Sequence, residues 1–290
     1  HKEYRRQRQM CIRDRHEAVS TDIEMVLPAL VATSPMKNGL GNRMQLVLSA
    51  QAIADAEGRT FYYHWPVGKD GRRQFGARLD ELWEYTGGIP IDEPGPTPMV
   101  EFFSQHGFGD LEPVRNEPVI SLTGNGAIPA LGDSRDWTDM LPELTPTEEV
   151  RDLSAGPFGN LGPEFIGVQV RAHPTLTHHL TMAESPVEWF IGRMLAVREE
   201  RPDAAFYLSC DTSSAEERIK DAVPGVVSVQ KAGEYNSRQG LIESVADLVV
   251  LSQSRQIIAP YVSTFAKLAW HMARRRIPFE TSKQFIPAKN

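Results

Sequence analysis

An arginine stands directly after an apolar run in the second half of the chain. Residues 165–170 (FIGVQV) are typical of a short buried parallel strand, and Arg171 follows them. A guanidinium offers a planar fork of N–H donors that matches the oxygens of a phosphate group. We therefore expect Arg171 to bind a phosphate, with an ordinary surface arginine as the alternative. Gln169 points to the same side of the strand and could contact a base edge or a ribose.

A second candidate phosphate site is the segment YVSTF at residues 261–265, between a predicted strand and a predicted helix. Ser263 is suited to cap this helix, and the unpaired backbone N–H groups of a helix start attract anions without a metal. Thr264 and Phe265 complete the turn. The cap and the anion site are compatible interpretations of the same residues.

The sequence NGLGNRM in the first half contains a third group of candidate residues: Gly39, Gly41, Asn42 and Arg43. It lacks the third glycine of a dinucleotide-binding fingerprint and the Gly-Lys-Ser/Thr of a P-loop. A tight turn would explain the glycines but not the amide and the guanidinium at the start of the following helix. We expect Asn42 and Arg43 to face a ligand cleft.

The elements that must position these residues alternate between strands and helices. In the second half, capping-box sequences at residues 185–188 and 213–216 predict two helix starts. Alternation of four strands with four helices indicates a doubly wound α/β domain, whose ligands bind at the carboxyl ends of parallel strands. This rule places Arg171, Asp211 and Ser263 on one edge of a sheet. The predicted strands are 165–170, 204–210, 225–230 and 256–261, and further helices are expected at 241–249 and 264–273.

The first half is less regular. A strand at 29–35, a helix at 45–57 with Gly58 as its C-cap glycine, and a strand at 60–65 form one strand–helix–strand unit. Residues 66–142 are interrupted by Pro and Gly and predict only a helix near 79–85 and a strand at 118–124.

The chain divides into three predicted parts. Residues 23–150 and 151–290 are expected to form two Rossmann-like domains that face each other across a cleft. Residues 1–22 are expected to be a non-native or disordered segment, because residues 1–15 carry six Lys or Arg against two Asp or Glu and show no apolar periodicity.

The composition excludes several classes of protein. The net charge of -7 argues against a nucleic-acid partner, and no apolar run reaches the 18 or more residues of a membrane span. The two cysteines, Cys11 and Cys210, form no CxxC pair, so neither a disulfide framework nor a thiolate metal site is expected. These features favour a cytoplasmic protein.

In their order along the chain, the motifs resemble those of a known enzyme family. The segments GLGNRM, GRTFYYHW, IGVQVRAH, FYLSCDTSSAEERI and ADLVVLSQSRQIIAPYVSTFAKLAW are similar to motifs of the nodulation, α-1,6- and protein O-fucosyltransferases. They span residues 29–270, although residues 66–142 match nothing in that family. The resemblance implies a GT-B fold and inverting, metal-independent transfer of fucose from GDP-fucose to a glycan or other hydroxyl acceptor, with no cofactor.

The resemblance also implies roles for individual residues. Arg171 corresponds to the essential β-phosphate arginine, Asp211 to the acidic residue after the next strand, and Asp247 to a guanine contact. Ser263, Thr264 and Phe265 correspond to the phosphate-binding turn, and Gly39, Gly41, Asn42 and Arg43 to the loop that approaches the diphosphate and the acceptor, with Asn42 expected to act beside Arg171 in catalysis.

Two positions depart from the family pattern. Gln169 stands where the family usually has a histidine near the guanine, and Ala172 stands where a second basic residue often follows the arginine. Both departures favour a different nucleotide sugar as the alternative donor.

Neither a metal site nor a single general base is evident in the sequence. The sequence contains no Asp-x-Asp pair, the usual carboxylate clamp for a divalent ion on a diphosphate. His173, His178 and His179 lack a nearby carboxylate, so we expect no metal site, and His173 is assigned to the substrate site instead. Asp211, His64 and His173 remain open as candidate bases.

One other class of function remains open, and a second is excluded. A protein that binds a sugar nucleotide or a glycan without turnover would need only the C-terminal half. An NAD-dependent enzyme would need a complete glycine fingerprint, which the sequence lacks. Hydrolysis of the donor without an acceptor would distinguish an enzyme from a binding protein.

Overall fold

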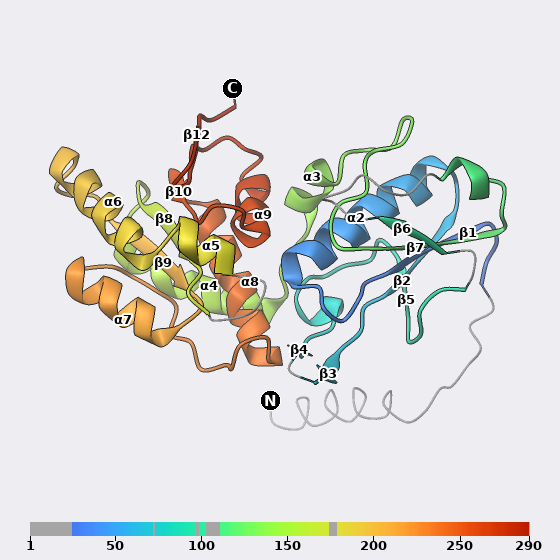
Figure 1. The fold of residues 1–290 in the computed structure, drawn as a ribbon, viewed down its shortest axis with the longest axis horizontal. Coiled ribbons are helices and arrows are strands. Elements are labelled where there is room, and N and C mark those ends of the chain that lie inside the picture. The colour runs from blue at the N-terminus through green and yellow to red at the C-terminus, as the bar shows by residue number, and fades with distance from the viewer. Residues whose placement is uncertain (1–24, 72, 97–98, 103–110, 174–178, 290) are drawn as a thin grey trace, which may run out of the picture.

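Two α/β units lie side by side in the computed structural model, which describes residues 25–71, 73–96, 99–102, 111–173 and 179–289 (Figure 1). The segment predicted to be non-native or disordered, residues 1–22, lies outside these ranges. Each unit contains a five-stranded sheet, so the expected α/β architecture is confirmed. No helix within the described ranges is both long and apolar enough to cross a membrane.

The first sheet has the strand order β5-β2-β1-β7-β6, and all its strands are parallel. Its central strand β1 (Ala29–Thr33) is buried along its whole length, as expected when both faces of a parallel sheet are covered. Helix α2 (Leu40–Ala56) packs on this sheet and is buried on nearly all sides. The other strands are β2 (Thr60–His64), β5 (Ile89–Ile91), β6 (Met99–Phe102) and β7 (Val119–Gly124), and a hairpin pairs β3 (Gly68–Asp70) with β4 (Arg73–Phe75).

Two short helices and one longer helix connect the two sheets. The short ones are α3 (Trp137–Met140) and η4 (Leu141–Glu143). The longer one, α4 (Glu148–Leu161), packs against α8 (Arg238–Ser252) of the second unit, and the domain boundary expected between residues 150 and 151 falls within it. Two single 3₁₀ turns, η2 (Leu79–Glu81) and η3 (Glu112–Val114), lie within the first unit.

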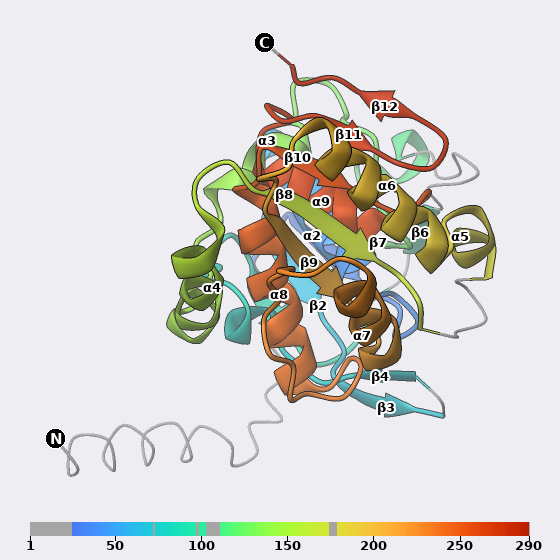
Figure 2. The same ribbon diagram turned by 90° about the vertical axis from the view of Figure 1, so that its left-hand side faces the viewer.

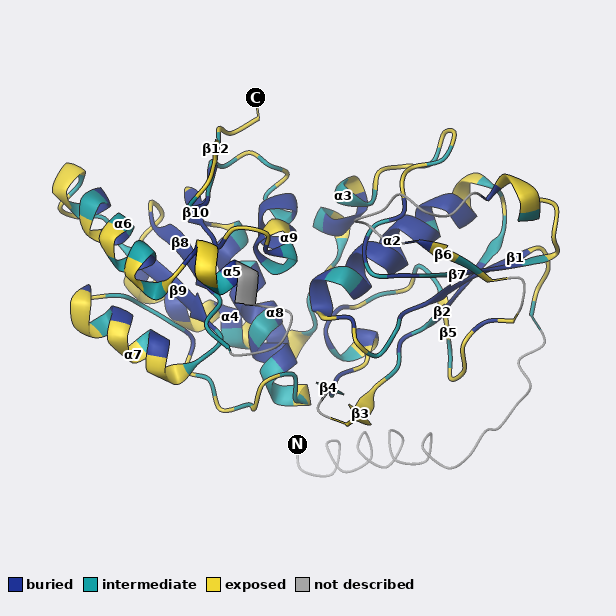
Figure 3. Ribbon diagram, viewed as in Figure 1, coloured by how far each residue is buried: buried dark blue, intermediate teal, exposed yellow. Residues whose placement is uncertain are grey.

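The second sheet has the order β12-β11-β10-β8-β9, in which only β12 is antiparallel to its neighbour. Helices α6 and α7 cover its outer face, while α8 and α9 lie between this sheet and the first unit (Figures 1 and 2). The outer helices expose one side, whereas α8 is largely buried (Figure 3). The elements are β8 (Ile166–Val170), α5 (His179–Glu184), α6 (Val187–Glu200), β9 (Phe206–Cys210), α7 (Ser213–Ala222), α8 (Arg238–Ser252), β10 (Gln256–Ile258), α9 (Thr264–Met272), β11 (Phe279–Glu280) and β12 (Phe285–Ile286).

Several local predictions need correction. Residues 225–230 do not form a strand: only Val227 makes an isolated bridge, to Tyr207. The predicted helix at 45–57 begins five residues earlier, at Leu40, and the helix near 79–85 is a single 3₁₀ turn. Gly58 does follow the end of α2 with a positive φ of 64°, as predicted.

Both predicted capping boxes are wrong in detail. The N-cap residues of α6 and α7 are Pro186 and Thr212, and neither makes a side-chain cap bond. The Ser185 hydroxyl instead accepts from the backbone N–H of Tyr261 and bonds the Ser282 hydroxyl. The Ser185 hydroxyl therefore bonds residues that are distant in the sequence instead of capping α6.

The two units are joined by a tight backbone contact. The N–H of Gly76, after the β3–β4 hairpin, donates to the carbonyl of Asn236 at 2.9 Å. A Cβ at Gly76 would lie 2.4 Å from the backbone nitrogen of Arg238, closer than real contacts allow. Arg238 also forms ion pairs with Glu81 at 2.7 Å and Glu149 at 3.0 Å. The absence of a side chain at Gly76 is therefore a condition for this contact.

We expect Gly76→Ala to lower the free energy of unfolding by about 1–3 kcal/mol, because the added methyl group meets backbone that cannot move away cheaply. Gly159→Ala is the control: it lies in helix α4 with nothing within 4 Å of the new Cβ, and it should stabilise by about 0.5–1 kcal/mol. Urea unfolding of both variants measures the difference, and equal effects at the two positions would contradict the close packing.

Candidate functional site

The carboxyl ends of β9, β8 and β10 form one edge of the second sheet, which we call the carboxyl edge. Strand β8 pairs in parallel with β9 on one side and with β10 on the other, so all three chains leave the sheet in the same direction. Asp211 follows β9, Arg171 follows β8, and Ser263 follows β10 after a short turn. The structure thus places these three predicted residues on one edge, as expected.

Arg171 is half-buried at this edge and lies near the side chain of Tyr235. Burial raises the pKa of the Tyr235 phenol, and the Arg171 guanidinium opposes that shift. The ring of Tyr235 stacks on the ring of His173, with centroids 4.2 Å apart and planes inclined by 14°. Arg171 and His173 therefore share one aromatic neighbour.

Asp211 shapes the chain that follows β8. Its Oδ1 accepts hydrogen bonds from the backbone N–H groups of Ala172 at 2.6 Å and His173 at 3.0 Å. These bonds link the ends of β8 and β9 and fix the direction of the residues after Arg171. The observed contacts of this oxygen are structural, and the predicted contact of Asp211 with a substrate stays a prediction.

Ser263 and Gln169 link the ends of β10 and β8. The Ser263 hydroxyl accepts from Ala266 N–H at 3.2 Å, which confirms the predicted N-cap of α9, and it donates to Gln169 Oε1 at 3.1 Å. Gln169 Nε2 donates to the carbonyl of Val170. Because Gln169 is only 5 % exposed, it braces the turn rather than presenting an amide to a base edge, contrary to expectation.

The turn before α9 has unusual backbone geometry. Val262 has a φ of 60°, a left-handed conformation that β-branched residues rarely adopt, and its side chain is exposed. Thr264 and Phe265 form the first turn of α9, where no acceptor for their N–H groups is found among the described residues. A cavity of about 190 Å³, lined in part by Tyr261 and Lys267, adjoins this turn.

The glycine-rich segment of the first unit meets this turn directly. A Cβ at Gly41 would lie 2.8 Å from Thr264 Oγ1 and 3.1 Å from the Thr264 carbonyl carbon, so α2 and α9 approach each other at their first turns. Gly39, the exposed N-cap of α2, provides no side-chain cap bond, and Asn42 is half-buried next to the contact. Two helix starts, each with positive partial charge, therefore converge beside the carboxyl edge.

Arg43 does not face a ligand, and this prediction is wrong. The side chain is fully buried and donates to the carbonyls of Asn38 at 2.9 Å and Pro66 at 2.7 Å. Its guanidinium carbon lies 3.7 Å from the centroid of the Phe75 ring. Burial lowers the pKa of Arg43 to about 9, so the group is still charged at neutral pH and holds the loop before α2 in place.

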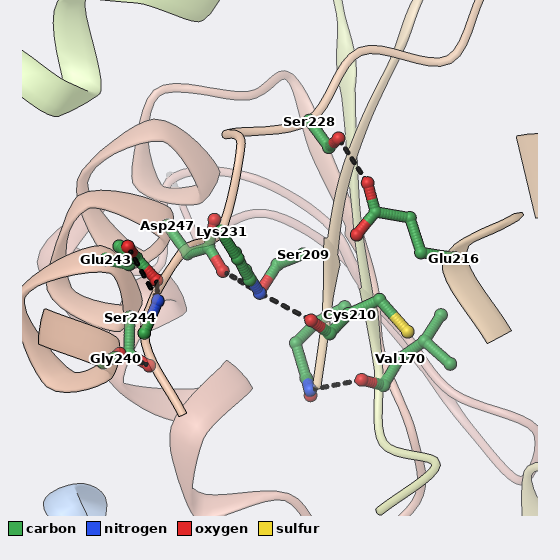
Figure 4. Close-up of polar contacts among 12 residues, drawn as sticks. Val170, Ser209, Cys210, Glu216, Ser228, Lys231, Gly240, Glu243, Ser244 and Asp247 are labelled. Atoms are coloured by element: carbon green, nitrogen blue, oxygen red, sulfur yellow. Dashed lines mark hydrogen bonds and ion pairs between the residues drawn. The ribbon is translucent and has the colours of Figure 1, made fainter. Parts of the chain in front are cut away.

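Asp247 is also placed differently from the expectation. It lies on α8, is 1 % exposed, and accepts from the hydroxyls of Tyr207 at 2.5 Å and Ser209 at 2.6 Å. Lys231 Nζ pairs with it at 2.8 Å and also donates to the carbonyl of Cys210 (Figure 4). Both carboxylate oxygens therefore have internal partners, and Asp247 has no open oxygen for a guanine.

The histidines and carboxylates are the candidate metal ligands and general bases. The described residues contain no group of three or more His, Cys, Asp or Glu side chains that could hold a metal. His178 lies outside the described residues, and the side chain of His179 is not described. Burial, followed by the charge of Arg43, lowers the pKa of His64. The Nδ1 atoms of His64 and His173 are buried and have no hydrogen-bond partner among the residues that the structure describes.

Tyr235 and Lys231 contact predicted site residues but were not predicted from the sequence. Both belong to the α7–α8 loop, residues 223–237, where neither apolar periodicity nor a motif marks them. Their partners His173 and Asp247 lie in other segments of the chain, so only the folded chain reveals the contacts.

We expect Lys231→Met to lower the free energy of unfolding by about 3 kcal/mol, the lower end for a broken buried ion pair because the Lys231 side chain is 26 % exposed. The matched control Lys220→Met, at a surface pair with Glu216 and a side chain 40 % exposed, should cost less than about 1 kcal/mol.

The pH dependence of the stability follows from the ion pair between Lys231 and Asp247. Burial by itself lowers the pKa of Lys231, but the Asp247 carboxylate outweighs this effect and raises the pKa above its ordinary value. The stabilisation is therefore fully present below the unfolded lysine pKa of about 10.4 and is lost as pH rises through the folded pKa. Chemical unfolding from pH 6 to 9 should show a constant difference in the free energy of unfolding between parent and Lys231→Met. If this difference disappears within that pH range, the ion pair with Asp247 does not stabilise the protein as described.

No protein-family model matches the sequence, and no curated protein matches it. Among solved structures, fucosyltransferase NodZ from Bradyrhizobium matches with a TM-score of 0.60 and 16% identity, covering 90% of this chain and 99% of NodZ. POFUT1 in complex with GDP matches with a TM-score of 0.58 and 14% identity, covering 90% of this chain and 100% of that one. The chain therefore has the GT-B-like fold of the NodZ and POFUT1 fucosyltransferases over nearly its full described length.

Proposed function

We propose that this chain is a glycosyltransferase that transfers a sugar from a nucleotide-sugar donor to a hydroxyl group of a glycan or another acceptor. The proposed donor is GDP-fucose. The observation that carries the proposal is the approach of Gly41 to Thr264, which brings two helix starts together beside Arg171 on the carboxyl edge. Support for the donor comes from the similar folds of NodZ soaked with GDP-fucose and POFUT1 in complex with GDP-fucose.

In the proposed complex, the diphosphate lies between Arg171 and the first turn of α9. The guanidinium would bind two phosphate oxygens, and the backbone N–H groups of Thr264 and Phe265 would bind others. The start of α2, with Gly39 and Asn42, would approach the same group from the first unit. These groups are fixed before reaction, so they stabilise negative charge at little reorganisation cost.

The proposed reaction is inverting and needs neither a metal nor a cofactor. The acceptor oxygen attacks the anomeric carbon from the face opposite the diphosphate, the bond from that carbon to the phosphate oxygen breaks, and the nucleoside diphosphate leaves with the electron pair. The acceptor proton passes to solvent or to a base. Of the three candidate bases, Asp211 binds backbone N–H groups through Oδ1, and the histidines have one shielded nitrogen each.

One observation favours a second candidate, a transferase whose donor carries another base. Asp247, the residue that by resemblance would bind guanine, already holds Lys231, Tyr207 and Ser209. A carboxylate with both oxygens occupied cannot also accept the N1–H and amino group of guanine without losing partners. A thermal-shift screen of GDP, UDP, ADP and CDP, with their sugars, distinguishes the two donors, since a ligand at 100 times its Kd stabilises by about 2.7 kcal/mol.

We expect Arg171→Lys to fold normally and to reduce kcat more than it weakens donor binding. Lysine keeps a positive charge but loses the second hydrogen bond and the fixed plane of the guanidinium. Arg171→Ala should lose about a hundredfold or more in kcat/KM, equivalent to about 3 kcal/mol. Steady-state kinetics test this prediction, with the melting temperature of each variant as the control for folding. Near-parent turnover in two well-folded variants would show that Arg171 is not part of the donor site.

Activity should survive treatment with EDTA. The proposal assigns charge stabilisation to Arg171 and to two helix starts, and the chain has no Asp-x-Asp pair. Turnover is measured after dialysis against EDTA and again after addition of Mn²⁺ or Mg²⁺. Loss of turnover that either ion restores would rule out the metal-independent mechanism.

A further inference from the structure

A small cavity at the carboxyl edge has no role in the proposed binding of the donor. Its volume is about 190 Å³, and it is lined by the turn after β10, by Lys267 of α9 and by Thr281 and Gln284 after β11. In the sheet, β10 has β11 on one side and β8 on the other. The cavity therefore lies on the β11 side of the turn, whereas Arg171 lies on the β8 side.

Hydrogen bonds hold the walls of this cavity in place. The Ser185 hydroxyl accepts from the backbone N–H of Tyr261 at 2.9 Å and bonds the Ser282 hydroxyl at 2.9 Å, so it joins the turn after β10 to the turn after β11. Thr281 Oγ1 accepts from the backbone N–H of Gln284 at 3.1 Å and closes the second turn. A ligand therefore meets a cavity that is already formed, which reduces the entropy lost on binding.

The lining combines an aromatic ring, an amide and an ammonium group. Tyr261 is 37 % exposed, and Lys267 and Gln284 are exposed as well. Among the described residues, neither the Lys267 ammonium nor the Gln284 amide has a hydrogen-bond or ion-pair partner. An aromatic face packs against the C–H groups of a sugar ring, and an amide bonds hydroxyl groups. The lining is thus suited to a carbohydrate.

The size of the cavity limits the ligand to a small group. Its volume of about 190 Å³ is about six times the share of one water in the liquid, and it is below the range of about 300–1,000 Å³ that is typical of pockets for drug-sized ligands. One sugar ring is therefore a better match than a nucleotide.

The charge around the cavity favours a ligand that carries a negative charge. Of the described residues that line it, only Lys267 is charged. The nearby carboxylates already have cationic partners: Glu280 pairs with Arg193 at 2.5 Å, and Glu184 pairs with Lys283 at 2.5 Å. Neither carboxylate therefore neutralises the charge of Lys267.

Positive charge continues beyond Lys267. Residues 267–289 contain six Lys or Arg against one Glu, although the net charge of the whole chain is -7. Burial, followed by the charge of Arg275, lowers the pKa of His271 to about 3; Lys267 and Lys289 act in the same direction, and Asp136 opposes them. The cavity therefore borders a positively charged part of the protein.

The cavity is also next to the proposed site of transfer. Lys267 follows Thr264 by three residues on α9, which corresponds to about 4.5 Å along the helix axis. Thr264 belongs to the turn that we assign to the donor diphosphate. The cavity is thus within reach of a neighbouring sugar of an acceptor whose hydroxyl group attacks the donor.

We propose that the cavity binds a hexuronate residue of the acceptor glycan. The Lys267 ammonium pairs with the carboxylate, the Tyr261 ring packs against the sugar ring, and the Gln284 amide bonds its hydroxyl groups. A single ammonium matches the single charge of a carboxylate, whereas a phosphate monoester carries about two. The assignment to an acceptor rests on the proposed function, but binding of the acidic sugar is tested without a donor.

The first experiment measures binding to the full chain by NMR titration with glucuronate and with glucose. The parent is compared with Lys267→Gln and with the control Lys69→Gln, which changes an exposed lysine of β3 in the first unit. The parent should bind glucuronate about tenfold more tightly than glucose, as for one hydrogen bond to a charged group. Lys267→Gln should lose this preference and Lys69→Gln should keep it. No preference in the parent, or an unchanged preference in Lys267→Gln, would overturn the assignment.

Acetate distinguishes an acidic sugar from any other carboxylate, because it has the charge without the ring. It should bind the parent at least tenfold more weakly than glucuronate does. Tyr261→Ala should weaken glucuronate binding severalfold and leave acetate binding unchanged, with the melting temperature as the control for folding. If acetate binds as tightly as glucuronate, the cavity is an anion site only and the sugar assignment is wrong.

The second experiment measures transfer to a panel of oligosaccharides that contain glucuronate and to their neutral, carboxyl-reduced forms. In the parent, kcat/KM should be about tenfold higher for the acidic form of an acceptor, and in Lys267→Gln it should be nearly equal for the two forms. Turnover with none of the acidic members, or a preference for a neutral form, would overturn the assignment to the acceptor.

The outcomes separate this inference from the proposed function. If the parent binds glucuronate through Lys267 but binds no nucleotide sugar, the acidic-sugar site stands and the proposed function fails. If the parent turns over a nucleotide sugar but does not prefer glucuronate to glucose, the proposed function stands and this inference fails.

Discussion

The parallel pairing of β8 with both β9 and β10 is the constraint on which the proposed site depends. Because parallel neighbours end at the same edge, the residues after these three strands, Asp211, Arg171 and the Ser263 turn, are forced together although they lie about 40 to 90 positions apart. The side-chain contacts then refine this placement: Asp211 fixes the backbone after Arg171, and Gln169 braces the Ser263 cap. If β9 or β10 ran antiparallel to β8, its following residues would lie at the opposite edge of the sheet and these contacts could not form.

Buried polar groups near this edge serve mainly to hold backbone in place. Three buried charged side chains have several hydrogen-bond partners each inside the protein: Arg43, Glu243 and Asp247. A buried charge without such partners would lower the stability of the fold, because the interior has a low dielectric constant. Their effect is to hold in place the loop before α2, the α7–α8 loop and strand β9. The proposed ligand contacts are thus few, and most charged side chains around them are structural.

The contact between the units makes the site a property of the whole chain. Gly41 against Thr264 and Gly76 against the start of α8 are backbone approaches that tolerate no side chain, so the relative position of the two sheets is set by atoms that cannot adjust. A continuous hydrophobic core also includes residues of both units. A shift of either unit would therefore change the spacing of the two helix starts.

The sequence by itself determined the α/β class, six of the twelve described strands, the cap at Ser263 and the edge on which Arg171 lies. These features follow from apolar runs, helix caps and the direction of parallel strands, which are local or topological signals. It also carried the resemblance to fucosyltransferases that the shared fold bears out. It failed for Arg43, Gln169 and Asp247, and for Tyr235 and Lys231. A polar side chain beside a motif has the same local pattern whether it faces a ligand or a buried partner, and only the tertiary structure decides, because those partners come from distant segments.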